Sequence, residues 1–194
     1  MKKILVAALV LINAIALSAQ EQPKGLNVND KAPDFTALNQ SGKKTTLSEE
    51  LRNGAVVLVF YRGQWCPYCN RQLKRLEDSL SLVTAKGATV LCITAEKEEN
   101  ISKTIEKTKA SFPILHDYGL KIMKRYEVAF AVDEKTVTAY KKYGIDFDQA
   151  NGSNGANLPV PAVFIINKEG KIVYRHFDMD YTKRATVKEI LSFL

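Results

Sequence analysis

Two cysteines three residues apart form the most reactive motif of the chain. Cys66 and Cys69 stand in the segment RGQWCPYC, directly after a run of apolar residues. This spacing lets the two sulfurs close a small disulfide ring, and the start of a helix stabilises a thiolate on the first cysteine. The pattern therefore predicts a catalytic dithiol that alternates between reduced and disulfide forms.

The residues around the two cysteines are candidates for substrate binding. Pro67 stands between the cysteines, as is typical of redox motifs at a strand-to-helix junction. Trp65 and Tyr68 either flank a substrate groove or pack the turn. Arg62 either adds positive potential that favours a thiolate or is an ordinary surface arginine.

Other uses of a Cys-x-x-Cys pair fit this sequence less well. A structural zinc site needs four ligands, and Cys92, His116 and His176 are isolated in or near apolar segments. Attachment of c-type haem requires a histidine after the second cysteine, where Asn70 stands. We expect no metal and no bound cofactor, and a purely structural disulfide stays open. Cys92 is interpreted as a core residue, with a resolving role as the alternative.

A second informative site is the segment LPVPA. Pro161 has no amide hydrogen to donate to a sheet and fixes a turn before an apolar strand. The Val160–Pro161 bond is a candidate for the cis form, which would expose the carbonyl and N–H groups of Val160 to an extended thiol substrate. Val160 and Pro161 are therefore further candidates for substrate binding.

Strands and helices alternate on both sides of the dithiol. Apolar runs predict strands at residues 55–61, 88–94, 162–166 and 171–175. Amphipathic or charged stretches predict helices at residues 69–85, 96–111, 120–126 and 182–194. This order implies an α/β fold in which a central mixed sheet has helices on both faces.

The ends of the chain and one internal segment differ from this pattern. Residues 1–19 combine two lysines, an apolar stretch and a small residue before the cleavage point, which predicts a secretory signal peptide rather than an uncleaved anchor. Residues 20–30 are expected to form a linker and residues 31–194 a single domain. The polar segment at about 131–158, with a short helix at 136–143, is interpreted as an insertion.

Composition limits the partners of the protein. The 194 residues include 46% hydrophobic and 25% charged residues, as in ordinary globular proteins, and the formal net charge is +7. Basic residues come in scattered pairs, so we expect no nucleic-acid partner. We also expect export to the periplasm or the extracellular space, with no stable membrane insertion after cleavage.

These motifs resemble known families. The Cys-x-x-Cys motif behind an apolar strand and the Val-Pro-Ala segment resemble the thioredoxin superfamily. APDF at residues 32–35, FPILHD at 112–117 and FIINKEGKIVYR at 164–175 resemble the alkyl hydroperoxide reductase/thiol-specific antioxidant family, the peroxiredoxins. FYRGQWCPYCNRQL is similar to a peroxiredoxin-like subgroup with an Arg-Gly-x-Trp-Cys-Pro-x-Cys motif. The resemblance covers residues 28–194.

The resemblance implies a thioredoxin-like fold and a thiol-based oxidoreductase. In the peroxiredoxin pattern Cys69 matches the cysteine that attacks peroxide, whereas in the thioredoxin pattern Cys66 attacks and Cys69 resolves. The implied substrate is a hydroperoxide or, alternatively, a protein disulfide, and the implied partner is an external thiol donor such as a dithiol protein. A catalytically silent binding module with the same fold is the third alternative.

Overall fold

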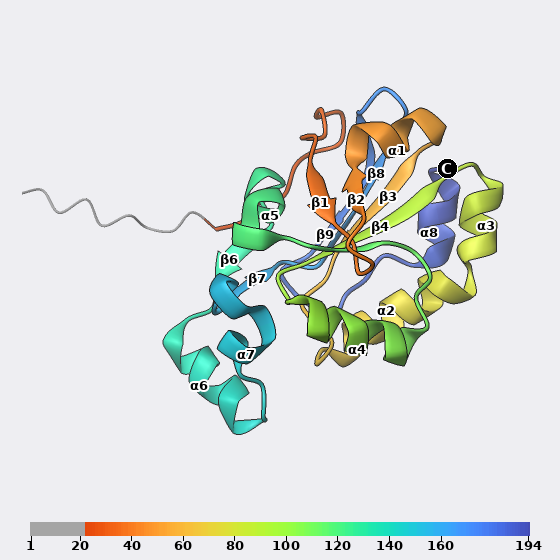
Figure 1. The fold of residues 1–194 in the computed structure, drawn as a ribbon. Helices are drawn as coiled ribbons and strands as arrows, with labels where there is room; N and C mark the ends of the chain where they lie inside the picture. Colours follow the sequence, from red (N-terminus) through yellow and green to blue (C-terminus); the bar gives the residue numbers. More distant parts are fainter. Residues whose placement is uncertain (1–21) are drawn as a thin grey trace, which may run out of the picture.

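The computed structural model describes residues 22–194 and contains a central five-stranded sheet (Figure 1). The predicted signal peptide lies outside the described residues. The strand order is β5-β4-β3-β8-β9, in which β3, β4 and β5 run parallel and β8 and β9 are antiparallel to their neighbours. The five strands are β3 (Val56–Phe60), β4 (Thr89–Thr94), β5 (Ile114–His116), β8 (Ala162–Ile166) and β9 (Ile172–Phe177).

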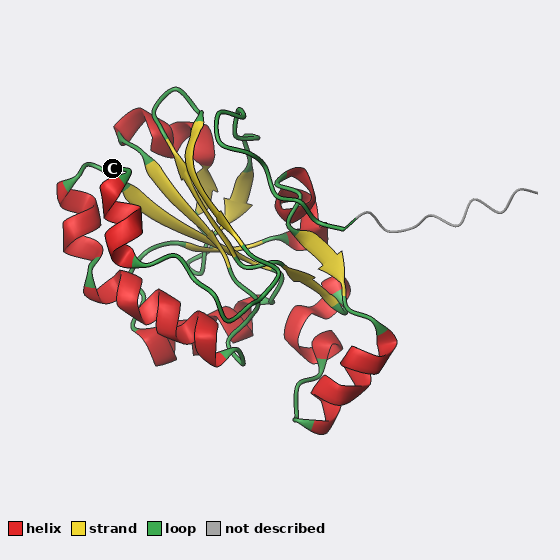
Figure 2. Ribbon diagram, turned by 180° about the vertical axis from the view of Figure 1, so that it is seen from behind, coloured by secondary structure: helices red, strands yellow, loops and turns green. Residues whose placement is uncertain are grey.

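Helices cover both faces of this sheet (Figures 1 and 2). One face packs against a first group of helices, α2 (Pro67–Asp78), α3 (Leu80–Ala85), α4 (Glu98–Thr108) and α8 (Val187–Ser192). The other face packs against α1 (Leu47–Asn53) and α5 (Lys121–Arg125). A short hairpin of β1 (Thr36–Leu38) and β2 (Lys44–Thr46) precedes α1. The mixed α/β fold with covered faces is as predicted.

The central strand β3 contributes to both halves of the core. Val57 and Val59 join the cluster under α2, whereas Val56, Leu58 and Phe60 join the opposite cluster. Successive side chains of a strand point to opposite faces, so a strand covered on both sides is apolar at every position. All five β3 residues are fully buried. This burial fixes β3 as the support from which the cysteine loop leaves the sheet.

The structure corrects three details of the sequence prediction. The helix expected at 69–85 begins at Pro67 and breaks at Ser79 into α2 and α3. The short strand β5 was not predicted, because it has only three residues and follows Pro113. The described part of the expected linker is bound to the domain: the Gly25 N–H donates to the Glu127 carbonyl, and the Asn29 N–H donates to the Ile172 carbonyl.

The predicted insertion leaves and rejoins the domain at one two-stranded ribbon. Its strands are β6 (Ala129–Ala131) and β7 (Asn157–Pro159), which pair antiparallel. Between them lie α6 (Glu134–Lys142), α7 (Phe147–Asn151) and a short 3₁₀ turn (Gly152–Asn154). In Figure 1 this unit projects from the sheet on the side where β6 and β7 meet.

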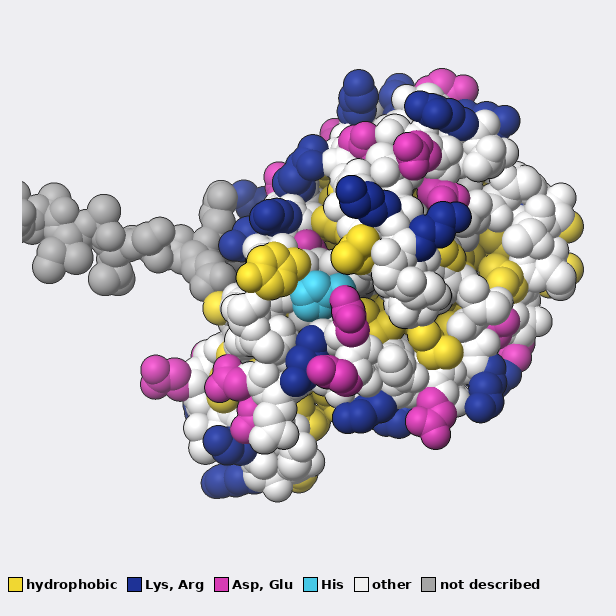
Figure 3. Space-filling view, viewed as in Figure 1, with side chains coloured by type: hydrophobic (Ala, Val, Ile, Leu, Met, Phe, Trp, Pro, Cys, Tyr) yellow, Lys and Arg dark blue, Asp and Glu magenta, His cyan; other side chains and the backbone are white. Residues whose placement is uncertain are grey.

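Charged side chains of both signs are dispersed over the surface in Figure 3, as expected from the scattered basic pairs of the sequence. On the face drawn in Figure 3, basic and acidic side chains alternate and form no continuous basic stripe. Among residues 22–194, no helix combines the length and the apolar character that crossing a membrane requires.

Candidate active site

The cysteine pair lies at the junction between β3 and α2. Cys66 is the N-cap of α2, and its Sγ accepts the N–H of Cys69 at 3.3 Å, as serine and threonine caps do for the third helical residue. Pro67 occupies the first helical position, where no amide hydrogen is needed. A hydrogen bond from the Cys66 N–H to the Gly63 carbonyl at 3.0 Å closes the loop. These local features aim both sulfurs at each other.

The two thiols are reduced and in direct contact. The Cys69 thiol donates to Cys66 Sγ, with 2.7 Å between the sulfurs. This bond, the N–H of Cys69 and the charges of Arg62 and Arg184 lower the pKa of Cys66 to about 6, against the opposing effect of burial. Burial and the bond to Cys66 raise the pKa of Cys69 well above its ordinary value. Cys66 is therefore the thiolate at neutral pH and Cys69 the thiol.

Both sulfurs are shielded from bulk solvent. Cys66 is 1% exposed and Cys69 is fully buried. Arg184 lies beside them, and its Nη2 donates to Cys69 Sγ at 3.7 Å.

Arg62 is a buried residue rather than a surface arginine. It is 5% exposed, and its guanidinium lies 4.9 Å from the Trp65 ring centre and 4.3 Å from that of Tyr181. Its Nη2 donates to the hydroxyl of Tyr140. Cation–π contacts in a buried setting hold the charge in one place, next to the thiolate.

The inserted segment covers the loop through aromatic contacts. Trp65 packs edge-on against Tyr140 of α6 at 5.3 Å and Phe147 of α7 at 5.9 Å between ring centres. On the other side of the loop, Tyr68 contacts Tyr181 at 5.8 Å. Trp65 and Tyr68 therefore pack the turn, and Trp65 forms part of the contact with the insertion.

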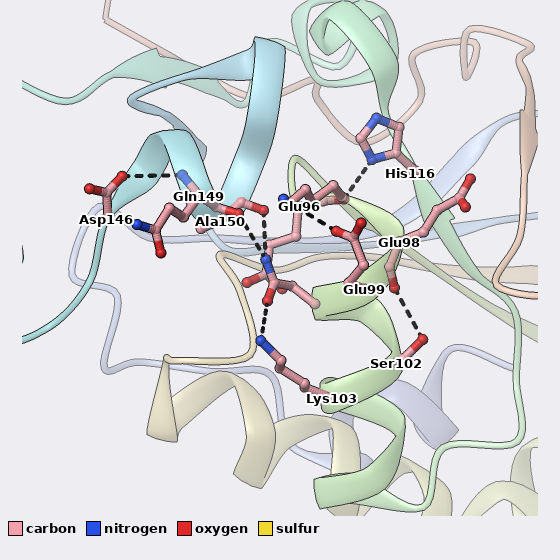
Figure 4. A network of polar contacts seen from close by, with 11 residues as sticks. Glu96, Glu98, Glu99, Ser102, Lys103, His116, Asp146, Gln149 and Ala150 are labelled. Carbon is pink, nitrogen blue, oxygen red and sulfur yellow. Dashed lines mark hydrogen bonds and ion pairs between the residues drawn. The ribbon is translucent and has the colours of Figure 1, made fainter.

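Polar contacts attach the insertion to α4 (Figure 4). The side-chain amide of Asn100 donates to the carbonyls of Ala150 at 3.0 Å and Gln149 at 3.3 Å, and Lys103 donates to the Asn100 oxygen at 3.1 Å. The Lys97 N–H also donates to the Ala150 carbonyl. The insertion is held on two sides, by Trp65 and by α4.

A buried carboxyl group lies under the cysteine loop. Glu96 follows the end of β4 and is fully buried, and its Oε2 accepts the Gln64 N–H at 2.8 Å. Its Oε1 and the Trp65 Nε1 have no hydrogen-bond partner. A Cβ at Gly63 would lie 2.5 Å from that nitrogen and 2.7 Å from Oε1, so only glycine fits between them. Burial raises the pKa of Glu96 to about 8.

The Val160–Pro161 segment differs from the cis alternative. No peptide bond of residues 22–194 is cis, so this bond is trans. The Val160 N–H donates to the Val128 carbonyl at 2.8 Å, and the side chain is 1% exposed. The free strand edge expected at Val160 is therefore not present, because β6 and β7 use it. Pairing of Phe60 with Ala162 still places Pro161 at the β3 end that leads to the cysteines.

Cys92 is separate in character from the reactive pair. It lies in the middle of β4, fully buried, and burial raises the pKa of its thiol. This placement agrees with its interpretation as a core residue.

Several residues of the site were not found from the sequence. Glu96 follows the carboxyl end of a parallel strand next to β3, and that position is a recognisable signal for a functional side chain. Arg184 and Tyr140 carried no such signal, because they come from segments 115 and 71 positions away from Cys69.

Comparison with known proteins assigns the fold and the family. The AhpC/TSA family model matches residues 28–175, well over half of the chain. The chain belongs to the AhpC/TSA family. This AhpC/TSA protein is 26% identical over 157 residues to a Mycobacterium tuberculosis protein named as a peroxiredoxin, covering 81% of this chain and 88% of the relative. It is 24% identical over 149 residues to the thiol-disulfide oxidoreductase ResA of Bacillus cereus, covering 76% and 68%.

Solved structures agree on the fold. Peroxidoxin BcpB from Mycobacterium tuberculosis superposes with a TM-score of 0.67 at 20% identity, over 87% of this chain and 96% of that structure. The family and these relatives make the AhpC/TSA protein a thiol-dependent oxidoreductase with a thioredoxin-like fold.

Proposed function

We propose that the protein is an exported thiol peroxidase that reduces hydroperoxides through a cycle of the Cys66 and Cys69 thiols. The observation that carries the proposal is the contact between a Cys66 of lowered pKa and a buried Cys69 thiol 2.7 Å away. The near-complete burial of both sulfurs favours a small hydroperoxide over a protein as substrate. The similarity to peroxiredoxins supports the same choice.

The first chemical step takes place at Cys66. Its thiolate attacks the terminal oxygen of the hydroperoxide, an S–O bond forms and the O–O bond breaks. The leaving alkoxide takes up a proton and departs as an alcohol, which leaves a sulfenic acid on Cys66. The buried Arg62 beside the site supplies fixed positive charge for the anion that leaves.

The second step forms the disulfide. Cys69 gives up its proton, its sulfur attacks the sulfenic sulfur of Cys66, and the S–O bond breaks to release water. Helical backbone holds the two sulfurs in contact, so this step needs no large rearrangement. An external dithiol donor then returns two electrons and two protons. Apart from this external donor, the proposed cycle uses only the thiols of Cys66 and Cys69, without a metal or organic cofactor.

Thiol–disulfide exchange is the second candidate function. Cys66 at the helix N-cap, with Cys69 as its buried partner, is the arrangement in which the first cysteine attacks a disulfide and the second resolves it. In the peroxiredoxin pattern that the sequence resembles, a proline stands seven residues before the attacking cysteine and an arginine three residues before the phenylalanine of the late strand. This chain has Arg62 and Pro161 at those positions, which favours thiol–disulfide exchange. The similarity to ResA points the same way.

Trapping the first intermediate separates the two functions. We expect wild-type protein with dithiothreitol to consume an alkyl hydroperoxide, and Cys69→Ser to accumulate a sulfenic acid on Cys66 that a dimedone probe captures. Cys66→Ser is the matched control and gives no adduct at that position. Peroxidase function would be rejected if the wild type consumed no hydroperoxide while Cys69→Ser formed mixed disulfides with an oxidised test protein.

Export has its own test. The predicted cleavage after Ala19 gives a mature chain that starts at Gln20. Intact-mass measurement of the protein from the envelope fraction of the expressing cells should show this start. A chain that keeps residue 1 and stays in the cytosolic fraction would contradict export.

A further inference from the structure

A cavity beside the dithiol is rich in arginine side chains. It has a volume of about 320 Å³ and is lined by residues of α2 and of the segment that leads into α8, on the same side of the sheet. Three arginines line it: Arg71 and Arg75 from α2, and Arg184 from the segment before α8. Within residues 22–194, none of the three forms an ion pair with a carboxylate.

The other groups of the cavity do not cancel this charge. Asp78 also lines the cavity, but its carboxylate pairs with Lys74 one turn away on α2. The Nε of Arg184 is buried and has no hydrogen-bond partner. Guanidinium groups bind carboxylates through paired N–H donors. The Nη groups of Arg184 donate to the Lys183 carbonyl and to Cys69 Sγ, whereas within residues 22–194 the guanidinium groups of Arg71 and Arg75 donate no hydrogen bond.

The remaining walls are partly apolar. Leu76 and Ala185 are buried at the cavity, and Val187 is half-buried beside them. The ring of Tyr68 forms a further wall, and the Arg71 guanidinium lies 5.5 Å from its centre. A volume of about 320 Å³ with apolar walls and a few charged groups is typical of sites for small organic molecules. The fitting ligand has a carboxylate at one end and an apolar chain at the other.

Arg184 connects the cavity to the cysteines. Its Nη2 lies 3.7 Å from Cys69 Sγ, and its charge acts on both thiols. The other charged group that acts on Cys66 is Arg62, from the loop after β3, and the carboxyl group of Glu96, from the end of β4, interacts with Cys69 when both are ionised. A carboxylate on Arg184 would cancel part of the positive potential at the sulfurs, whereas Arg62 and Glu96 would stay as they are.

We propose that this cavity binds a small carboxylic acid with an apolar chain, and that Arg184 transmits its occupancy to the Cys66–Cys69 pair. The site is distinct from the dithiol itself, since neither cysteine lines the cavity. A bound carboxylate reduces the fraction of Cys66 that is ionised and thereby slows its reaction with oxidants.

Binding can be measured without any turnover. Sodium octanoate is titrated into the reduced protein in a calorimeter, with octanol and acetate as analogues that lack the charge or the chain. We expect one site for octanoate, and binding at least tenfold weaker for both analogues and for the double variant Arg71→Gln/Arg75→Gln. Arg52→Gln, an exposed arginine of α1 outside the cavity, is the matched control and should bind like wild type.

Two results would overturn the site. One is equal octanoate affinity in the wild type and the double variant, and the other is acetate binding as tight as octanoate. Glutamine is a good helix former, and both positions are exposed, so the variant is expected to fold. Circular dichroism and thermal unfolding check this directly.

The coupling to the cysteines has a separate readout. Thiolate absorbance near 240 nm is followed against pH with and without saturating octanoate. We expect octanoate to move the midpoint of Cys66 upward by about half a pH unit, which is roughly a threefold change in the ionisation constant. An unmoved midpoint with octanoate bound would disprove the coupling. Neither measurement depends on the peroxidase proposal, so the two can fail independently.

Discussion

The ionisation of Cys66 depends most on the side chain of Cys69. The thiol of Cys69 is the largest of the groups that lower the Cys66 pKa, ahead of the backbone N–H and the two arginines. The same bond helps to raise the pKa of Cys69. One hydrogen bond thus assigns different roles to two chemically identical side chains.

This assignment predicts different results for two substitutions of one residue. Cys69→Ala removes the donor to Cys66, and we expect the Cys66 pKa to rise from about 6 by about one unit, because a hydrogen bond to a charged group contributes about 1.5–3 kcal/mol before partial replacement by water. Cys69→Ser keeps an O–H donor, and we expect a smaller rise. The rate of alkylation by iodoacetamide against pH measures both midpoints. If Cys66 had the same pKa in Cys69→Ala and Cys69→Ser, the hydrogen bond from the side chain of residue 69 would not control the Cys66 pKa.

Glu96 predicts a pH dependence of stability. Its pKa is about 8 in the folded protein and about 4.5 when unfolded, so the folded state holds the proton more tightly. Proton binding to Glu96 therefore stabilises the folded state, and this stabilisation is fully present below pH 4.5 and is lost as the pH rises through 8. We expect Glu96→Gln to resemble the protonated acid and to be more stable than wild type at pH 8.5, by up to about 5 kcal/mol. Urea unfolding at pH 5 and pH 8.5 measures the difference.

The comparison between the two pH values is the control for Glu96. At pH 5 the wild type already carries mostly the neutral acid, so wild type and Glu96→Gln should differ little. A constant difference at both pH values would indicate a packing effect instead of ionisation.

At the scale of elements, the insertion acts as a cover over the cysteine loop. Helices α6 and α7 reach Trp65 through Tyr140 and Phe147, and α4 holds α7 from the other side. Trp65 is the only tryptophan in the sequence, so its fluorescence reports on this contact. The cover can be tested without changing any cysteine.

We expect Tyr140→Ala to loosen the cover. The substitution removes the ring contacts with Trp65 and Phe147 and the hydroxyl that accepts from Arg62. Trp65 emission should shift to longer wavelength, acrylamide should quench it more strongly, and bulky maleimides should react with Cys66 several-fold faster. Tyr140→Phe keeps the ring and is the matched control, with near-wild-type emission. Identical quenching of both variants and the wild type would contradict a role of α6 as cover.

The elements that a single long pattern specifies were predictable, and those that depend on distant partners were not. The runs AVVLVFY and AVFII are apolar at every position. AVFII forms β8 with the predicted bounds, and AVVLVFY forms β3 with one residue fewer at each end. The position of the cysteine pair at the start of a helix was also predicted, although the helix begins at Pro67 and not at Cys69. By contrast, α7 and β5 are short, and their hydrogen bonds and packing come from other segments. The cis alternative for Val160–Pro161 is not present, and the Val160 N–H that it would have exposed donates to the carbonyl of Val128, a residue far away in the sequence.

For the whole molecule, the lowered pKa of Cys66 stabilises the folded state of the reduced protein. The pKa is about 6 when folded and 9.0 for a free thiol, so this contribution is present above pH 9 and is lost as the pH falls through 6. Between pH 5 and pH 8, we expect the free energy of unfolding of the reduced wild type to rise by roughly 2–3 kcal/mol relative to that of Cys66→Ser. Urea unfolding of both reduced proteins tests this. A constant difference between them would contradict a thiolate in the folded state.

The β6–β7 ribbon has a consequence for how such a protein can change. Ala131 pairs with Asn157, so the chain leaves the domain and returns to it at adjacent points. Closing a loop of different length between such points costs little free energy. This contiguous stretch can therefore be replaced by a shorter or longer one, which would change what reaches the cysteine loop, while β3 and α2 keep the positions of the two sulfurs. Selection for substrate and selection for reactivity would then act on separate parts of the gene.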